Sequence, residues 1–255
     1  MLNMSAGYKV VVEQIVRTGL VGSVEEVVDD DLVTFERLPL LLTRREEREA
    51  RAGKAVWHDD PKGWYASSQS DLDALAGWIP DYLAPHTSLA EGRERCWKCS
   101  DLTPVYCLAS RGEYLTRHEI YDENQTQTEA FIWSLTGCGA FFGNLVLANG
   151  SLLRMLATQC PSYHLDYSKQ AQGNYFMNHC ASCGAKLGDF YMHSEPGGAF
   201  FPTSDEQAKE IKLRHFDIPL LLKAGAGVTS PDPLPHCTDL GWLTAESRMS
   251  PKLIP

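Results

Sequence analysis

A chain of 255 residues with an ordinary globular composition can form one large domain or two small ones. Its 33 acidic residues outnumber its 23 Lys and Arg residues, and the formal net charge of −10 opposes contact with nucleic acid or an anionic membrane, so we expect neither as a partner. No apolar run approaches the roughly 20 residues that span a bilayer, and eight cysteines without a secretory signal predict a reducing compartment, the cytoplasm.

The N-terminal third of the chain mixes strand and helix signals. Residues 8–16 and 32–42 are short β-rich runs, which predict strands. Residues 43–55 alternate in charge at helical spacing, a pattern of a solvated helix or a charged hairpin. Residues 70–83 carry apolar side chains along one helical face, and Ser70 is the expected N-cap of that helix.

Strand signals surround a long apolar stretch in the middle of the chain. Within residues 93–110, polar and apolar residues alternate after the cysteines, which predicts a strand, and residues 112–123 also predict a strand. The apolar residues 128–160 indicate two short buried helices. Residues 174–178 and 186–193 predict strands on either side of a cysteine pair.

The C-terminal part begins with a helix signal and ends in a Pro-rich segment. Ser204 and Gln207 have the spacing of a capping box, which predicts a helix start. Residues 228–242 contain several prolines, and we expect them to lie extended over the surface.

Two C-x-x-C pairs, Cys96 with Cys99 and Cys180 with Cys183, are separated by 80 residues. Each pair can form a tight turn with two inward thiolates, and four thiolates at about 2.3 Å make a tetrahedral structural zinc site. Gly184 fits the positive-φ position of such a turn, whereas Ser100 in the matching place of the first turn has to tolerate some strain or adopt a different conformation. The spacing predicts two β-hairpin turns that meet at one Zn²⁺, with a domain-sized insertion between them.

Three other readings of the cysteine pairs stay open. They can be two unrelated reduced pairs, or four ligands of an iron–sulfur cluster. The sequence "CWKC" has the spacing of a redox dithiol, but it lacks an apolar strand before it, and Pro104 interrupts any helix after it. The glycine of the second turn favours zinc or mononuclear iron over a cluster, and we expect one structural Zn²⁺.

The cysteine motifs also carry a resemblance. The pattern C-W-x-C, a strand, and then N-x-C-x-x-C-G-A-x-x-G-D, over residues 95–202, resembles a group of largely uncharacterised bacterial proteins with a split four-cysteine zinc ribbon. The resemblance implies a structural zinc held by the same four cysteines, and it implies no reaction.

These patterns together predict an α+β fold with three regions. Residues 1–90 are expected to form an N-terminal α/β-mixed region. Residues 91–202 are expected to form the split zinc-ribbon hairpins, with a mostly helical insertion at about 110–170. Residues 203–255 are expected to supply a C-terminal helix and strand and a Pro-rich tail.

Other residues with catalytic or ligating side chains give weaker signals. His164 and Asp166 project from the same face of a predicted strand, as a metal-binding or acid–base pair or as an ordinary surface pair. His179 could replace a metal ligand, but Cys180 fits the turn better. The lone cysteines are expected to be buried core residues; they are Cys107, Cys138, Cys160 and Cys237. No Ser–His–Asp order, phosphate-binding glycine loop or H-E-x-x-H motif is present, so we assign no catalytic and no cofactor-binding residue.

The sequence therefore predicts a non-catalytic zinc protein that binds another protein. An inhibitor or immunity-type protein that neutralises a basic toxin or nuclease fits the acidic charge. The alternative is an enzyme or accessory factor that acts on nucleic acid or a small metabolite, with the zinc purely structural. The cations near the cysteine pairs alternate with acidic residues, which argues against a surface that follows phosphates.

Overall fold

The computed structural model describes residues 6–29, 32–67, 69–121, 127–227 and 232–243. These residues form a mixed α+β structure in which strands predominate, so the α+β class is confirmed. The helices are α1 (Ala6–Arg17), α2 (Glu47–Ala52), α3 (Leu72–Leu75), α4 (Gly150–Gln159), α5 (Asp189–Ser194), α6 (Asp205–Glu210) and the 3-10 helix η1 (Leu234–His236). None of them has the length and apolar composition that crossing a bilayer requires.

Most strands belong to one curled sheet. Its order is β1-β2-β10-β9-β6-β16-β11-β8-β7-β15-β17, and β13 extends it from β11 toward β12 and β14; a second sheet has the order β3-β5-β4. The strands are β1 (Val24–Asp29), β2 (Leu32–Phe35), β3 (Arg37–Pro39), β4 (Val56–Asp59), β5 (Lys62–Ser67), β6 (Tyr82–Ala84), β7 (Thr87–Arg95), β8 (Leu102–Ser110), β9 (Tyr114–Tyr121), β10 (Gln127–Thr136), β11 (Ala140–Ala148), β12 (Tyr163–Ser168), β13 (Gly173–His179), β14 (Lys186–Leu187), β15 (Lys212–Phe216), β16 (Leu220–Gly227) and β17 (Thr238–Trp242).

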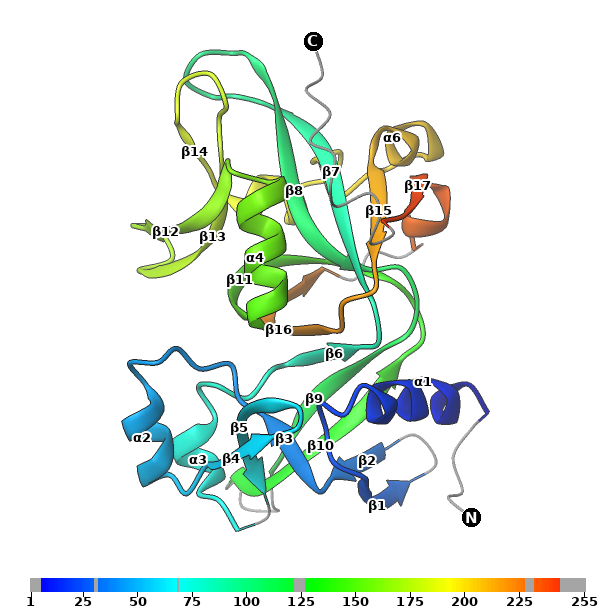
Figure 1. Ribbon diagram of the computed structural model, residues 1–255. Coiled ribbons are helices and arrows are strands. Elements are labelled where there is room, and N and C mark those ends of the chain that lie inside the picture. Colours follow the sequence, from blue (N-terminus) through cyan, green and yellow to red (C-terminus); the bar gives the residue numbers. More distant parts are fainter. Residues whose placement is uncertain (1–5, 30–31, 68, 122–126, 228–231, 244–255) are drawn as a thin grey trace.

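The elements gather in two lobes (Figure 1). The N-terminal lobe contains α1–α3 and β1–β5 together with the long hairpin β9–β10, which reaches down from the middle of the molecule. The cysteine lobe contains β7, β8, β11–β15, β17 and α4–α6, and strands β6 and β16 lie between the two lobes. The boundaries of the three expected regions stay predictions.

The first expected strand, residues 8–16, is wrong, because this segment lies within helix α1. The buried side chains are Tyr8, Val11, Val12 and Ile15, whereas Val10 is 53 % exposed. Burial at this spacing is the helical period, so packing against the core outweighs the strand preference of the valines.

The mostly helical insertion at about 110–170 is also wrong. Strands β9, β10, β11 and β12 fill the segment, and α4 is its one helix among the described residues. Phe141 and Phe142 are both fully buried, but they pack into two different core clusters. A strand that is buried on both faces reads as a continuous apolar run, and its sequence resembles that of a buried helix.

Smaller differences concern element ends. Of residues 186–193, Lys186 and Leu187 form a strand, Gly188 is the N-cap of α5, and the remaining residues lie in α5. The helix in residues 70–83 is short and its N-cap is Asp71, because Ser70 donates its hydroxyl to the carbonyl of Lys54.

The other expected helices form as α2 and α6, and the cap of α6 is Ser204 as predicted. Residues 232–242 form η1 and β17 where we expected an extended tail, and residues 228–231 lie outside the described part.

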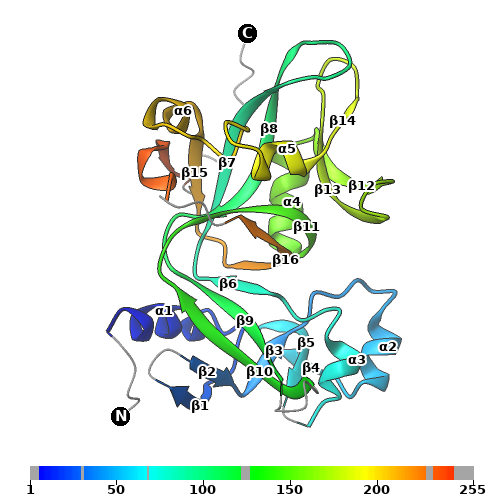
Figure 2. The ribbon, with the colours of Figure 1, turned by 180° about the vertical axis from the view of Figure 1, so that it is seen from behind.

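Both faces of strands β8 and β11 carry a hydrophobic core. On one face Leu108, Phe142 and Leu145 pack against α4. On the other face Val105, Phe141 and Met192 of α5 belong to the cluster that reaches Cys96 and Cys180. Figures 1 and 2, which view the molecule from opposite sides, show α4 and α5 over these two faces. The cysteine pairs therefore rest on a packed core rather than on free loops.

Candidate metal centre

Two hairpins bring the four cysteines together. Cys96 and Cys99 lie in the turn between β7 and β8, which is closed by the pair Arg95 and Leu102. Cys180 and Cys183 lie in the turn between β13 and β14. Both hairpin tips lie at the same end of the molecule, opposite the N-terminal lobe (Figure 1). The structure thus juxtaposes the four residues that the sequence predicts.

The two turns have matching hydrogen bonds. The backbone N–H of Cys96 donates to the carbonyl of Asp101 at 2.9 Å, and Cys180 donates to Ala185 at 2.9 Å. The carbonyl of each of these cysteines accepts from the residue four positions on, which is Ser100 or Gly184, at 2.9 and 2.8 Å.

The residue after the second cysteine adopts a positive φ in both turns. The φ angle is 65° at Ser100 and 69° at Gly184. Glycine adopts this conformation readily, whereas an L residue with a Cβ is strained there. Of the two possibilities at Ser100, the structure has the strained positive φ, and the first turn keeps the geometry of the second.

The distances between the sulfurs suit a metal ion. The four Sγ atoms lie within 4.8 Å of one another. Two contacts of 3.6 Å join the two hairpins, one between Cys96 and Cys183 and one between Cys99 and Cys180. A disulfide needs about 2.05 Å, whereas sulfurs around a tetrahedral zinc with bonds of about 2.3 Å lie roughly 3.8 Å apart. The four-cysteine cluster fits a metal ion, and the identity of the ion belongs to the proposal below.

Backbone N–H groups favour thiolates in the cluster. The N–H groups of Cys183 and Ser182 lower the pKa of Cys180 to about 6. The pKa of Cys96 is lowered in the same way, chiefly by the N–H of Cys99. At Cys99 the N–H of Asp101 acts in the same direction, but burial and the neighbouring thiols raise the pKa to about 12. Several thiolates at this separation repel one another, and a bound cation removes that repulsion.

Contacts around the cysteines lock the hairpins together. The indole Nε1–H of Trp97, in the first turn, donates to the carbonyl of Lys186 in the second hairpin at 2.9 Å. The backbone N–H of Ala181 donates to the hydroxyl of Thr103 at 3.0 Å, and Thr103 is buried. These contacts hold the two turns in register without using any cysteine.

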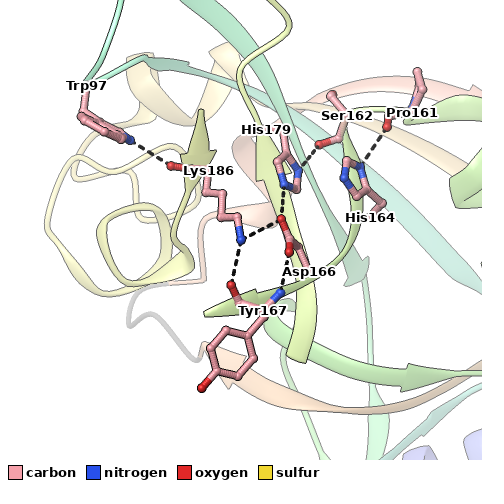
Figure 3. A network of polar contacts seen from close by, with 8 residues as sticks. All are labelled: Trp97, Pro161, Ser162, His164, Asp166, Tyr167, His179 and Lys186. Atoms are coloured by element: carbon pink, nitrogen blue, oxygen red, sulfur yellow. Dashed lines mark hydrogen bonds and ion pairs between the residues drawn. The ribbon is translucent and has the colours of Figure 1, made fainter. Parts of the chain in front are cut away.

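A polar network lies beside the second hairpin (Figure 3). His164 and Asp166 share a face of β12, as the sequence predicts, and both meet His179. Asp166 accepts from Lys186 at 2.9 Å and from His179 Nε2 at 3.1 Å. The Lys186 ammonium beside Asp166, together with His179, holds the pKa of this carboxyl far below its usual range.

This network does not supply a metal ligand. The imidazole of His164 stacks on that of His179 at 3.9 Å. The Nδ1 of His179 faces the carbonyl of Ser162 at 3.2 Å while Nε2 faces Asp166, so both ring nitrogens are engaged. His179 is therefore not available as a metal ligand, and Cys180 remains the ligand of this turn.

The structure also forms a Ser–His–Asp contact that sequence order did not predict. Ser88 Oγ lies 2.8 Å from His215 Nδ1, and His215 Nε2 lies 3.1 Å from Asp239, which also pairs with Arg111. These residues meet because β15 pairs with both β7 and β17, and no local pattern in the sequence signals that pairing. Ser88 and His215 are 3 % and 2 % exposed, so the hydroxyl cannot reach a substrate, and the contact fastens β17 to the sheet.

The lone cysteines lie apart from the metal cluster. Cys107 and Cys160 are buried, and Cys138 and Cys237 are half-buried. Burial raises the pKa of Cys107 well above its usual value and that of Cys160 to about 12, so both are unreactive thiols of the core.

Comparisons with known proteins add nothing to this geometry. No family model, no curated protein and no solved structure matches the chain. The resemblance to bacterial split-ribbon proteins is thus supported by the cysteine cluster alone.

Proposed function

We propose that the chain is a non-catalytic protein that binds one structural Zn²⁺ through Cys96, Cys99, Cys180 and Cys183 and acts by binding another protein. The observation that carries the proposal is the convergence of four thiols from two matching turns within 4.8 Å. Four thiolates complete a tetrahedral zinc site, so no coordination position is left for water or a substrate.

The metal has a structural role in this account. It cross-links the hairpins β7–β8 and β13–β14 and so closes a loop of 80 residues that contains β8 to β13. The unfolded chain lacks a preformed site, and the free energy of metal binding therefore contributes to folding. We expect the split zinc ribbon, rather than the hydrogen bonds of Trp97 and Thr103 alone, to fix the hairpin tips.

Charge and exposed apolar groups support a protein partner. Four thiolates and one Zn²⁺ add two negative charges to the formal −10, and an acidic surface attracts a basic partner. At the hairpin tip Trp97 is 73 % exposed and Leu102 is 54 % exposed. Exposed apolar side chains, tryptophan above all, are frequent anchors of protein interfaces. A basic toxin or nuclease, neutralised by an inhibitor or immunity-type chain, is the narrower form of the proposal.

Two arrangements among the described residues have side chains that an enzyme could use, and neither is suited to catalysis. The Ser88–His215–Asp239 contact has the residue types of a hydrolase, but its serine is buried at the start of β7. The Asp166 and His179 pair is held by Lys186 and by the backbone carbonyl of Ser162. We therefore favour binding over catalysis.

Affinity purification followed by binding kinetics tests the proposed function. We expect a stoichiometric basic protein whose association rate falls steeply between low and physiological salt while its dissociation rate changes little. Trp97→Ala should weaken the complex about tenfold or more, as expected for an interface anchor. Trp57→Ala, which removes a tryptophan that is 44 % exposed in the N-terminal lobe, is the matched control and should have no effect. Lack of a stoichiometric partner, or equal effects of the two substitutions, would count against the proposal.

A further inference from the structure

The small sheet β3-β5-β4 lies in the N-terminal lobe, far from the metal centre (Figure 1), and it carries a recess. Strand alternation gives this sheet two different faces. Leu38, Trp64 and Ala66 point into the first hydrophobic core. The opposite face carries Arg37 and Tyr65 from β3 and β5, and His58 from β4. These three side chains line a recess of about 330 Å³, which is within the size range of small-molecule sites.

The guanidinium of Arg37 is held in a fixed position at this recess. Its Nη2 donates to the carbonyl of Gly19 at 3.0 Å, and its Nη1 lies 3.0 Å from Nδ1 of His58. The guanidinium also lies over the ring of Tyr65, 4.8 Å from the centroid. Because arginine can only donate, Nδ1 of His58 accepts, and its Nε2–H stays a donor. A guanidinium fixed in this way loses little conformational freedom when a ligand binds.

The guanidinium of Arg37 forms no direct ion pair in the described part of the chain. Arg37 is absent from the ion pairs that these residues form. Its Nε–H is buried and finds no acceptor among them. The adjacent Glu36 also lines the recess; hydrogen bonds from Ser23, the hydroxyl at 2.8 Å, and the nearby charge of Arg37 lower the pKa of its carboxyl, but it forms no ion pair with the guanidinium. A buried donor without an acceptor costs free energy, and an anion that reaches the guanidinium can recover part of that cost.

We propose that this recess binds a small molecule through an oxyanion, a carboxylate or a phosphate, which pairs with the guanidinium of Arg37. The guanidinium offers donors in a planar fork that matches either anion. Ser67 and Gln69 also line the recess and supply neutral hydrogen-bonding groups for the rest of the ligand, and Val56 supplies an apolar wall. The site is separate from the metal centre and does not depend on the proposed function of the chain.

Titration of the full-length, metal-loaded protein with inorganic phosphate and, separately, with acetate tests the site. The Nε–H resonance of Arg37 in a ¹⁵N–¹H correlation spectrum is the direct readout. We expect this resonance to shift and saturate with at least one of the probes, at concentrations on the order of millimolar for such small ions. Saturation by phosphate alone indicates a phosphate-bearing ligand, by acetate alone a carboxylate ligand, and by both a general oxyanion site.

Substitutions then locate the binding. Arg37→Gln should weaken the preferred probe at least tenfold, and Arg37→Lys, which keeps the charge but loses the fork, several-fold. Arg17→Gln removes a charge from an exposed arginine of α1 and should leave binding unchanged. The proposal is overturned if neither probe gives a saturable shift in the wild-type protein, or if Arg37→Gln binds as well as the wild type.

Discussion

Asp189 offers a quantitative test of the core beside the metal centre. Its side chain is 2 % exposed in α5; Oδ2 accepts from the backbone N–H of Asn144 at 2.6 Å, and Oδ1 has no partner among the described residues. Burial raises the pKa of this carboxyl from 3.8 to about 7. The substitution Asp189→Asn keeps the shape and the acceptor for Asn144 but removes the titration.

The sign and the size of the effect follow from proton linkage. Between pH 4 and pH 7 the unfolded chain has released the proton of Asp189 and the folded chain still holds it, so rising pH favours unfolding. The stability contributed by this group is complete below pH 4 and is lost as pH rises through about 7. About three pKa units at 1.36 kcal/mol each give a loss of up to about 4 kcal/mol.

Denaturant unfolding at a series of pH values, with the metal kept saturating, measures this difference. The free energy of unfolding of the wild type relative to Asp189→Asn should fall by up to about 4 kcal/mol from pH 4 to pH 7.5. The exposed substitution Asp73→Asn is the control and should track the wild type. A difference between wild type and Asp189→Asn that stays constant across this range would refute the reasoning.

Two further predictions concern the cysteine turns. Cys183→Ser should remove the metal cross-link that closes an 80-residue loop, and the free energy of unfolding should fall by roughly 4 kcal/mol on the loop-closure scale. Cys237 lies outside the cluster, and Cys237→Ser should lower the free energy of unfolding by less than about 1 kcal/mol. Equal melting temperatures of the two variants would contradict this prediction. Ser100→Gly should stabilise the metal-bound protein by about 1 kcal/mol, because glycine adopts the positive φ of this position without strain. Gly184→Ala should destabilise the protein by a similar amount. The added Cβ would meet no atom within 4 Å, so the loss comes from backbone strain alone. Opposite signs in thermal unfolding are the expected result, and a loss of stability in Ser100→Gly would be evidence against matching turns.

The metal site could be predicted from the sequence because its signal is local. Each C-x-x-C pair sets its own turn, and Gly184 marks the position where φ is positive. The meeting of the two distant C-x-x-C pairs could be predicted from the coordination number of the metal, since two thiolates do not complete a tetrahedral site. The cluster of His164, Asp166 and His179 could be predicted only in part. Strand alternation predicts that His164 and Asp166 share a face, but His179 joins them through the pairing of β12 with β13, which the local sequence does not indicate.

The fold was harder to predict because its decisive contacts are long-range. Valines at helical spacing in α1 and phenylalanines in the doubly buried β11 both favour the wrong element when they are read locally. Likewise, Ser88, His215 and Asp239 meet only through the order of strands in the sheet. The recess around Arg37 could not be predicted, because an arginine in a short strand gives no signal of a binding site and its neighbours come from other strands.

Metal analysis of the purified protein, combined with the absorption spectrum of the Co²⁺-substituted form, tests the central claim most directly. We expect close to one equivalent of zinc per chain, and a Co²⁺ spectrum with the intense bands of tetrahedral thiolate coordination that disappear in Cys183→Ser. A fully folded protein that binds no metal, or a Co²⁺ spectrum without thiolate bands, would contradict a four-cysteine zinc site.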